Sequence, residues 1–312
     1  MPAHVHVILN PRSAGGKGAR VLGRLPGRLT EAGFEHDLHV TRAPGHARAL
    51  AAGLPDEPGV RVLVVGGDGT LHEAVNGLID RGEPLPPVAV LPVGTGNDFF
   101  RMVRSGPGIE EALAALRVET PRYFDLGQVR WQGSASEVFV NLAGVGLDVE
   151  VLRRRARFRR VPGLLQYLCA LGTALVGFRR PSVVVRFDTP GAESRELSGE
   201  TLLTAVTVGP SVAGGIRLAP DARADDGALD LFMVEGLGVP AVARYLPSIF
   251  RGTHSNVPNI HMHRIRNLRI EEREGRDMHF ELDGELMPEA SPWIEIDILP
   301  GVLPILETGA GS

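Results

Sequence analysis

Three glycine-rich segments of this chain each follow a short apolar run and precede a segment with helical spacing. The apolar runs cover residues 5–9, 61–65 and 88–91, and the glycine-rich segments begin at Asn10, Gly66 and Pro92. Short β-branched runs bounded by turn residues indicate buried strands, and strands alternating with helices favour a doubly wound, mainly parallel sheet. Ligands bind at the carboxyl ends of the strands in such sheets, so we expect the three glycine turns to share one edge.

The second glycine turn contains the carboxylate of Asp68, a group that an ordinary phosphate-binding turn lacks. Glycines allow close backbone approach, and a following helix presents its positive end to an anion. Asp68 would repel phosphate unless a cation or a hydroxyl donor intervenes, which indicates metal-assisted phosphoryl chemistry. The alternative is an ordinary strand-to-helix turn. In either case we expect Thr70 to be the helix N-cap and Glu73 to complete a capping box.

Composition excludes several classes of protein. Of 312 residues, 43% are apolar and 22% charged, which is typical of a globular protein, and a net charge of −4 gives no global attraction to nucleic acid. The single cysteine, Cys169, excludes an internal disulfide, and the start of the chain lacks the features of a signal peptide. We therefore expect a cytoplasmic protein. Lys17 is the only lysine, either by chance or because a site there uses a compact ammonium group.

The hydrophobic pattern of the sequence changes near residue 120. Alternating strand-like runs then dominate up to residue 299, interrupted by helical segments near 149–178 and 239–251. We therefore predict an α/β domain over 1–121 and a mostly antiparallel, β-sandwich-like domain over 122–299. The tail from about 300 to 312 is expected to pack back onto the first domain, and only the residues after Glu307 have a composition typical of disorder.

Carboxylates of the second half occur at two Asp-Gly pairs, Asp226-Gly227 and Asp283-Gly284. An isolated Asp-Gly is most simply a hairpin turn. Glu285 favours a functional interpretation of the second pair, because two carboxylates two residues apart can lie on one side of a strand end. The histidines His72, His254, His261 and His263 lack metal-ligand spacing with acids, and we expect them to be structural.

Together these motifs resemble the diacylglycerol kinase catalytic family, and more narrowly the bacterial soluble lipid kinases related to diacylglycerol and sphingosine kinases. The resemblance rests on NPRSAGGKG from Asn10, GGDGTLHEAVNGL from Gly66, PVGTGNDF from Pro92, PDARADDGALD from Pro220 and LDGE from Leu282. It covers nearly the whole chain in the family's order. It implies ATP-dependent phosphorylation of a lipid hydroxyl, with the nucleotide in a cleft between the two domains.

The resemblance also implies roles for individual residues. The ATP-contacting positions, to which we add Lys17, are Asn10, Pro11, Arg12, Ser13, Ala14, Thr41, Gly66, Gly67, Asp68, Gly69, Thr70, Leu71, His72, Glu73, Thr95, Gly96 and Asn97. Asp68 would act near the phosphates and catalytic Mg²⁺, and Asp98 would shape the same rim. Of Asp283 and Glu285, one would be the base that accepts the proton of the lipid hydroxyl; Glu285 is favoured as base and Asp283 as support for Mg²⁺ or for orientation, but the sequence does not separate the two roles. A structural Mg²⁺ would be held by Asp226 and the main-chain oxygens of Arg223 and Ala228, whereas the role of Asp225 is open.

A lipid substrate requires contact with a membrane. Six arginines, Arg153, Arg154, Arg155, Arg157, Arg159 and Arg160, precede an apolar segment over 163–178 that is too short to span a bilayer. This pair of segments predicts peripheral contact with the inner membrane surface, or alternatively a solvated arginine face beside a core helix. Two other functions are open: a kinase of a soluble nucleotide, like the NAD kinases that share GGDGT, and a nucleotide-binding regulator without turnover.

Overall fold

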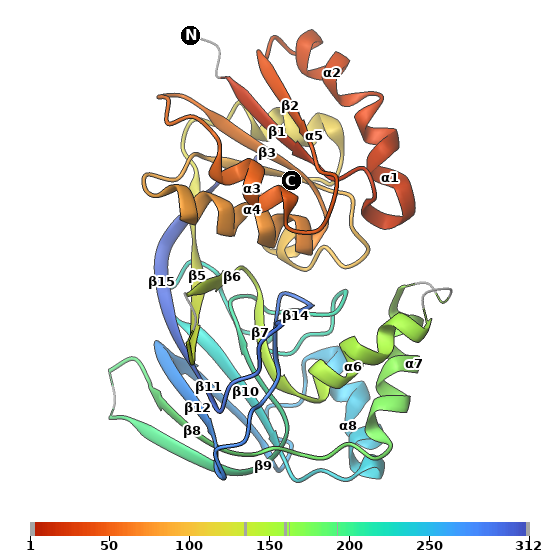
Figure 1. The fold of residues 1–312 in the computed structure, drawn as a ribbon, viewed down its shortest axis with the longest axis vertical. Coiled ribbons are helices and arrows are strands. Elements are labelled where there is room, and N and C mark those ends of the chain that lie inside the picture. Colours follow the sequence, from red (N-terminus) through yellow and green to blue (C-terminus); the bar gives the residue numbers. More distant parts are fainter. Residues whose placement is uncertain (1–3, 134–135, 159–160, 162, 192, 310–312) are drawn as a thin grey trace. The chain divides into compact units, whose positions relative to one another are not determined.

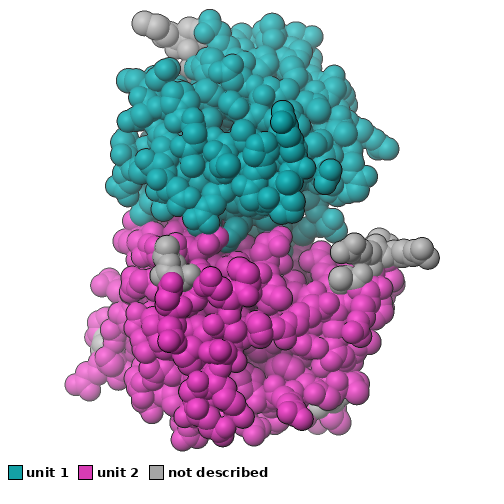
Figure 2. Space-filling view, in the orientation of Figure 1, with its two compact units in different colours: residues 1–124, 301–312 teal, residues 125–300 magenta. Residues whose placement is uncertain are grey.

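The computed structural model describes residues 4–133, 136–158, 161, 163–191 and 193–309. Their contacts divide the chain into two compact units (Figure 2): residues 1–124 with 301–312 form unit 1, and residues 125–300 form unit 2. Two strands, β5 (Arg122–Trp131) and β15 (Trp293–Ile305), begin in one unit and end in the other.

Unit 1 is built on a parallel sheet in the order β15, β4, β3, β1, β2 (Figure 1). The strands that lie wholly in this unit are β1 (Val5–Leu9), β2 (His36–Val40), β3 (Arg61–Gly66) and β4 (Val88–Pro92). β1 pairs in parallel with β2 and β3, and β4 pairs in parallel with β3 and with the end of β15. The carboxyl ends of these strands therefore meet at one edge, and the predicted parallel α/β architecture is confirmed.

The helices of unit 1 connect these strands. They are α1 (Ser13–Leu22), α2 (Leu25–Glu31), α3 (His46–Ala52), α4 (Asp68–Arg81) and α5 (Ile109–Ala115), with a 3-10 turn η1 (Phe99–Met102). Helical spacing in the sequence runs over residues 19–32 and predicts one helix there. The structure has two, because Pro26 stands in the first turn of α2. Proline has no amide hydrogen and its ring clashes with a preceding helical turn, so a new helix begins there.

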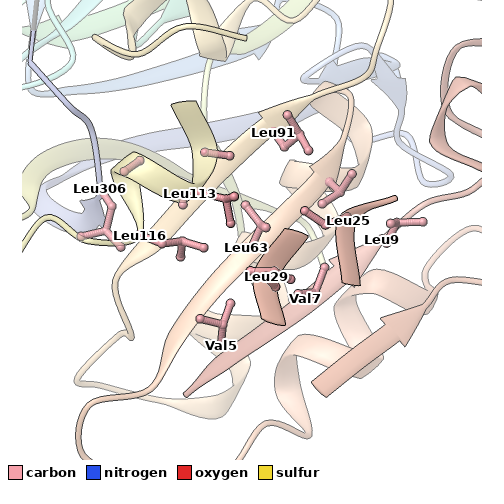
Figure 3. Packing of buried hydrophobic residues seen from close by; sticks show 14 residues of the cluster. Val5, Val7, Leu9, Leu25, Leu29, Leu63, Leu91, Leu113, Leu116 and Leu306 are labelled. Carbon is pink, nitrogen blue, oxygen red and sulfur yellow. The ribbon is translucent and has the colours of Figure 1, made fainter. Parts of the chain in front are cut away.

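The core on one face of this sheet joins alternate residues of β1 to the helices that cover them (Figure 3). Its buried members from β1, α2 and α5 or its C-cap are Val5, Val7, Leu9, Leu25, Leu29, Leu113 and Leu116. Leu306 belongs to the same cluster, and the Arg104 amide donates to the Glu307 carboxylate at 2.8 Å. The C-terminal segment is thus part of the core of unit 1. The disorder predicted after Glu307 falls partly on residues 310–312, which lie outside the described residues.

The capping box predicted at the start of α4 is wrong. α4 begins at Asp68 with Gly67 as its N-cap residue, and no side chain caps it. Thr70 Oγ1 accepts a hydrogen bond from Asn10 Nδ2 at 3.0 Å. The Glu73 carboxylate accepts hydrogen bonds from the amides of Gly45 (2.8 Å) and Ala47 (3.0 Å). Glu73 therefore caps the neighbouring helix α3, a contact that local spacing cannot indicate.

Unit 2 consists of two antiparallel layers joined by the long strand β9 (Arg195–Thr207). The first half of β9 pairs with β8 (Ser182–Asp188), and its second half pairs with β7 (Leu142–Gly146) and β10 (Leu229–Glu235). The first layer continues through β12 (Asn267–Glu272), β15, β5 and β6 (Glu137–Phe139). The second ends in β11 (Ile260–Ile265) on one side and in the hairpin of β13 (Phe280–Leu282) and β14 (Glu285–Leu286) on the other. The sandwich-like prediction is confirmed.

The helices of unit 2 share one apolar cluster with the second layer. They are α6 (Leu147–Arg155), α7 (Gly163–Leu175) and α8 (Val239–Arg251), with a 3-10 turn η2 (Ala156–Phe158). Val151 of α6, Ala170 of α7 and Val242 of α8 pack in the cluster that contains Phe232 of β10. In the part of the chain that the structure describes, no helix is both long enough and apolar enough to cross a membrane.

Gly77 tests the contact between α4 and α3. A Cβ at this position would lie 2.8 Å from the Ala51 Cβ and would collide with the Arg48 carbonyl oxygen. We expect Gly77→Ala to lower the free energy of unfolding by about 1–3 kcal/mol, because overpacking outweighs the gain in helix propensity. Denaturant unfolding followed by circular dichroism measures this change.

The matched control is Gly27→Ala in α2, where no atom lies within 4 Å of the added Cβ. This variant should stabilise unit 1 by about 0.5–1 kcal/mol. If both substitutions raised stability alike, the tight approach of α3 and α4 would be refuted.

Candidate active site

The three glycine turns lie against one another at the carboxyl edge of the sheet. The Asn10 amide donates to the Val65 carbonyl at 2.9 Å, and the Val93 amide donates to the Gly66 carbonyl at 2.7 Å. The side chain of Asn10 in the first turn donates to Thr70, just after the second. The predicted convergence of the turns is therefore a direct hydrogen-bonded contact, and we call this edge the glycine rim.

The backbones of the second and third turns touch where side chains are absent. A Cβ on Gly94 would lie 2.5 Å from both the Gly67 Cα and the Asn97 Oδ1, and a Cβ on Gly67 would lie 2.9 Å from the Gly94 Cα. Any other residue at either position would push the turns apart. The two glycines are therefore required by this close approach, in addition to any ligand.

The first turn has three successive residues with left-handed backbone angles. Ala14, Gly15 and Gly16 have φ angles of 46°, 68° and 98°, so regular helix geometry in α1 begins only after them. Successive amides in such turn conformations form concavities that bind anions. Asn10 Oδ1 accepts a hydrogen bond from the Arg12 amide at 3.0 Å, which fixes the entry of this turn. Lys17 follows it and is exposed.

Asp68 stands at the first position of α4, within the glycine rim. Its Oδ1 accepts a hydrogen bond from the Phe99 amide at 3.2 Å, so the carboxylate links the second turn to the end of the third. Asn97, in the third turn, has a φ of 51° and donates from Nδ2 to the Gly94 carbonyl at 3.1 Å. Asp98 is buried next to it. A carboxylate among anion-binding amides can face a phosphate only through a cation or a hydroxyl group.

The other residues predicted to contact the nucleotide differ in where they lie. Thr41 lies at the end of β2, where its amide donates to the Leu9 carbonyl at 2.9 Å, and Thr95 and Gly96 lie in the third turn. Leu71 and His72 are 2% and 4% exposed, so they are enclosed by unit 1 and do not reach the rim surface. The carboxylate of Glu73 is engaged at the start of α3, as described above.

In unit 2, the hairpin of β13 and β14 carries Asp283 and Glu285. Asp283 has a φ of 51° and lies at the turn between the strands. Its carboxylate accepts hydrogen bonds from the amides of Val140 (2.9 Å), Asn141 (2.8 Å) and Leu142 (2.9 Å). Asp283 therefore fastens the hairpin to the start of β7, whereas Glu285 is exposed beyond the turn.

Sequence reasoning missed an acidic cluster beside this hairpin. A Cβ on Gly144 of β7 would collide with Asp148 Oδ2 and would lie 3.1 Å from Glu281 Oε1, so both carboxylates close over this glycine. Burial raises the pKa of Asp148 to about 7, and burial together with the charges of Asp148 and Glu281 raises the pKa of Tyr167. No motif marks these residues, because they meet only after β7 and β13 pair.

Asp226, the predicted side-chain ligand of a structural Mg²⁺ in unit 2, pairs with Arg264. Asp226 Oδ2 accepts a hydrogen bond from Arg264 at 2.7 Å, and its Oδ1 accepts one from the Ala228 amide at 3.2 Å. Burial, and then the charge of Asp226, raises the pKa of Asp230 to about 6. Asp226 thus pairs with the guanidinium of Arg264, and a structural Mg²⁺ held by Asp226 with the main-chain oxygens of Arg223 and Ala228 stays a prediction.

Asp125 is a further residue that sequence reasoning missed. It is buried, and its Oδ2 accepts a hydrogen bond from the Gly227 amide at 2.8 Å, while its own amide donates to the Ala224 carbonyl at 2.6 Å. Asp125 therefore holds the Asp226 turn in place. The signal for it was an acidic residue between the apolar neighbours Phe124 and Leu126 of a strand.

Comparison with known proteins agrees with this architecture. Residues 4–129 match the diacylglycerol kinase catalytic domain, and residues 141–307 match the YegS C-terminal NAD kinase beta sandwich-like domain. A diacylglycerol kinase of Bacillus subtilis is 30% identical over 283 residues, covering 89% of this chain and 88% of the relative. A diacylglycerol kinase of Staphylococcus saprophyticus is 27% identical over 286 residues, covering 91% and 90%.

Solved structures show the same fold at lower identity. The crystal structure of a diacylglycerol kinase from Bacillus anthracis superimposes with a TM-score of 0.71 at 22% identity, covering 98% of this chain and 97% of that one. Yeast NADH kinase shares the fold distantly, with a TM-score of 0.50, 12% identity, and coverage of 98% and 83%. Fold and motifs define a kinase of the two-unit α/β plus β-sandwich class. The chain belongs to the diacylglycerol kinase catalytic-domain family.

Asp148 gives a pH-dependent prediction for unit 2. Burial raises its pKa to about 7 in the folded protein from an ordinary value of 3.8, so the folded state binds the proton more tightly than the unfolded state. The free energy of unfolding should therefore fall as pH rises from about 4 to about 7. Asp148→Asn removes this loss, and we expect it to raise the melting temperature at pH 8 relative to the wild type but not at pH 4.

Thermal unfolding at several pH values measures this difference. Asp277→Asn, at an exposed carboxyl of the same unit, is the control for removing one charge. A destabilised Asp148→Asn at pH 8 would show that the ionised carboxylate is what the fold requires.

Proposed function

We propose that this protein is an ATP-dependent lipid kinase that transfers the γ-phosphate of ATP to the hydroxyl of a diacylglycerol-like lipid. The observation that carries the proposal is the glycine rim, in which three contacting turns at the carboxyl edge of one sheet hold Asp68 beside their main chain. Membership of the diacylglycerol kinase family and the names of the relatives support a lipid acceptor.

In this proposal the glycine rim holds the phosphates of ATP. The left-handed turn at Ala14–Gly16 and the start of α4 supply amide donors, and the exposed Lys17 supplies a positive charge near them. Mg²⁺ bound with the nucleotide would neutralise charge on the phosphates. Asp68 is the carboxylate that fits beside such an ion, because it is fixed by the Phe99 amide at the start of a helix.

The acceptor side of the reaction is assigned to the hairpin of unit 2. The three amides bonded to Asp283 take up acceptor positions of its carboxylate and fix its orientation. Glu285 is exposed two residues later. We therefore assign Glu285 as the base that takes the proton of the lipid hydroxyl, and Asp283 as the residue that positions the hairpin.

Labelled ATP tests this assignment. With Mg²⁺ and a panel of diacylglycerol, phosphatidylglycerol, sphingoid base, ceramide and NAD, we expect transfer to a lipid. Asp68→Ala should lower kcat on the order of 100-fold or more, as expected for losing charge organisation at a phosphoryl-transfer site. Glu285→Gln should lower kcat with an unchanged melting temperature, whereas Asp283→Asn should lower both.

Asp56→Asn is the matched control in unit 1, because its carboxylate is largely exposed and pairs only with Arg81 among the described residues. Transfer to NAD and to no lipid would favour a kinase of a soluble nucleotide. ATP binding without transfer to any acceptor would favour a regulator and would refute the lipid kinase.

Peripheral contact with a membrane is assigned to the end of α6 and to α7. A groove of about 470 Å³ in unit 2 is lined by basic side chains together with Val149, Phe178 and Met278; the basic side chains are Arg153, Arg154, Arg179, Arg180, Arg276 and His279. Glu150 pairs with Arg154 at 2.7 Å and Glu272 pairs with Arg276 at 2.7 Å. Leu165 is 58% exposed and Val176 71% exposed, so apolar side chains accompany the arginines. Arg159 and Arg160 lie outside the described residues.

Anionic vesicles test this contact. Arg153→Gln, Arg155→Gln and Arg157→Gln combined should weaken binding by roughly 100-fold, because each basic residue near an anionic surface contributes about 1 kcal/mol. Activity on vesicles should fall more than activity on detergent-dispersed substrate. The control combines Arg195→Gln, Arg217→Gln and Arg266→Gln, which removes the same charge from exposed positions of unit 2 that do not line the groove. Equal losses on vesicles and on detergent would contradict the membrane role.

A further inference from the structure

A cluster of histidine and aspartate side chains lies on one face of β1 and β2: His4 and His6 are at the start of β1, Asp37 is at the start of β2 and His39 is two residues further along β2. In the parallel register His6 pairs with Asp37, and Ile8 pairs with His39. Because side chains alternate along a strand, His6, Asp37 and His39 share the face opposite to Val5, Val7 and Leu9 of the core. His4, two residues before His6, joins them.

The nitrogen and oxygen atoms of this cluster are close together. His4 Nε2 lies 2.9 Å from Asp37 Oδ2, and His6 Nδ1 lies 3.7 Å from the same oxygen. The ligand atoms of His4, His6 and Asp37 all lie within 4.8 Å of one another. His6 Nδ1 is also 3.1 Å from His39 Nε2.

These separations match a metal coordination shell. Zn²⁺ binds imidazole nitrogen and carboxylate oxygen at about 2.0–2.2 Å, which places tetrahedral ligand atoms roughly 3.3 Å apart. The His4–Asp37 and His6–Asp37 separations of 2.9 and 3.7 Å bracket that value. Imidazole with one carboxylate is a donor set that suits Zn²⁺ and its first-row neighbours rather than Mg²⁺ or Ca²⁺.

We propose that His4, His6 and Asp37 form a binding site for a divalent transition-metal ion, with Zn²⁺ as the natural occupant and His39 supporting the site from the next position of β2. The site is accessible, because the side chain of Asp37 is 60% exposed and that of His4 is 36% exposed, while His6 is buried and fixed.

A metal here would link β2 to the rest of the sheet. β2 is the edge strand of unit 1, and its only partner in the described sheet is β1. Two ligands come from the start of β1 and one from β2, so the ion would close a bridge between the two strands. The role is structural and separate from phosphoryl transfer, and it stands whether or not the protein is a lipid kinase.

The test uses the full chain without a histidine tag, stripped of metal with a chelator. Titration of Zn²⁺ against a competing chromophoric chelator should reveal one tight site per chain. Asp37→Asn should weaken binding at least tenfold, and His39→Ala should weaken it about 10- to 100-fold, as for residues that support metal ligands. Asp37 and His39 are at least partly exposed, so substituting either residue should leave the core of unit 1 intact. These two variants test the site even if His6→Ala, at a buried position, fails to fold.

Co²⁺ supplies a spectroscopic readout independent of kinase activity. The intense visible absorption of tetrahedral Co²⁺ should appear in the wild type and be lost in Asp37→Asn. His36→Ala is the matched control, because His36 lies on β2 one residue before Asp37 and faces the other side of the sheet. Absence of a stoichiometric site, or equal Zn²⁺ affinity in wild type, Asp37→Asn and His36→Ala, would overturn the proposal.

Discussion

The contact between the Gly67 and Gly94 backbones is the constraint on which the candidate active site depends. It brings two strand-to-helix turns within van der Waals distance, and the Asn10–Thr70 hydrogen bond attaches the third. Because each turn is fixed by the others, the amides of the rim are organised before any ligand arrives. Asp68 is fixed in the same way by Phe99. Preorganised dipoles of this kind do not have to reorient when charge develops, which is why they suit phosphoryl transfer.

A turn of unit 2 is also fixed before any ligand binds, by the carboxylate of Asp283 rather than by closely packed glycines. Asp283 adopts a left-handed backbone that is unfavourable for a residue with a side chain, and three amide hydrogen bonds from residues 140–142 compensate for it. The turn that presents Glu285 is thus determined by residues distant in sequence. Asp125 holds the Asp226 turn by the same type of bond. Buried or fixed acids in this unit serve first to shape loops.

The sequence predicted what depends on short-range pattern. Strands β1, β3 and β4, the helices after β3 and β4 and the change to antiparallel strands all follow from periodicity and turn residues, and the structure confirms them. The roles of individual site residues stay predictions. Contacts between residues distant in sequence could not be predicted. Glu73 accepts hydrogen bonds from the amides of α3 rather than from those of its own helix. Asp148 meets Glu281 only because β7 pairs with β13. Neither contact leaves a spacing that can be read locally.

The spacing of the histidine cluster is present in the sequence, but by itself it does not predict a site. His4 and His6 are two residues apart, as are Asp37 and His39, and that spacing places each pair on one face of a strand. Only the parallel register of β1 with β2 shows that the two faces coincide. The two ends of the same strands then have distinct chemistries. Main-chain amides gather at the carboxyl end and favour anions, whereas imidazole and carboxylate groups gather at the amino end and favour a cation, so one sheet offers two sites that need not interfere.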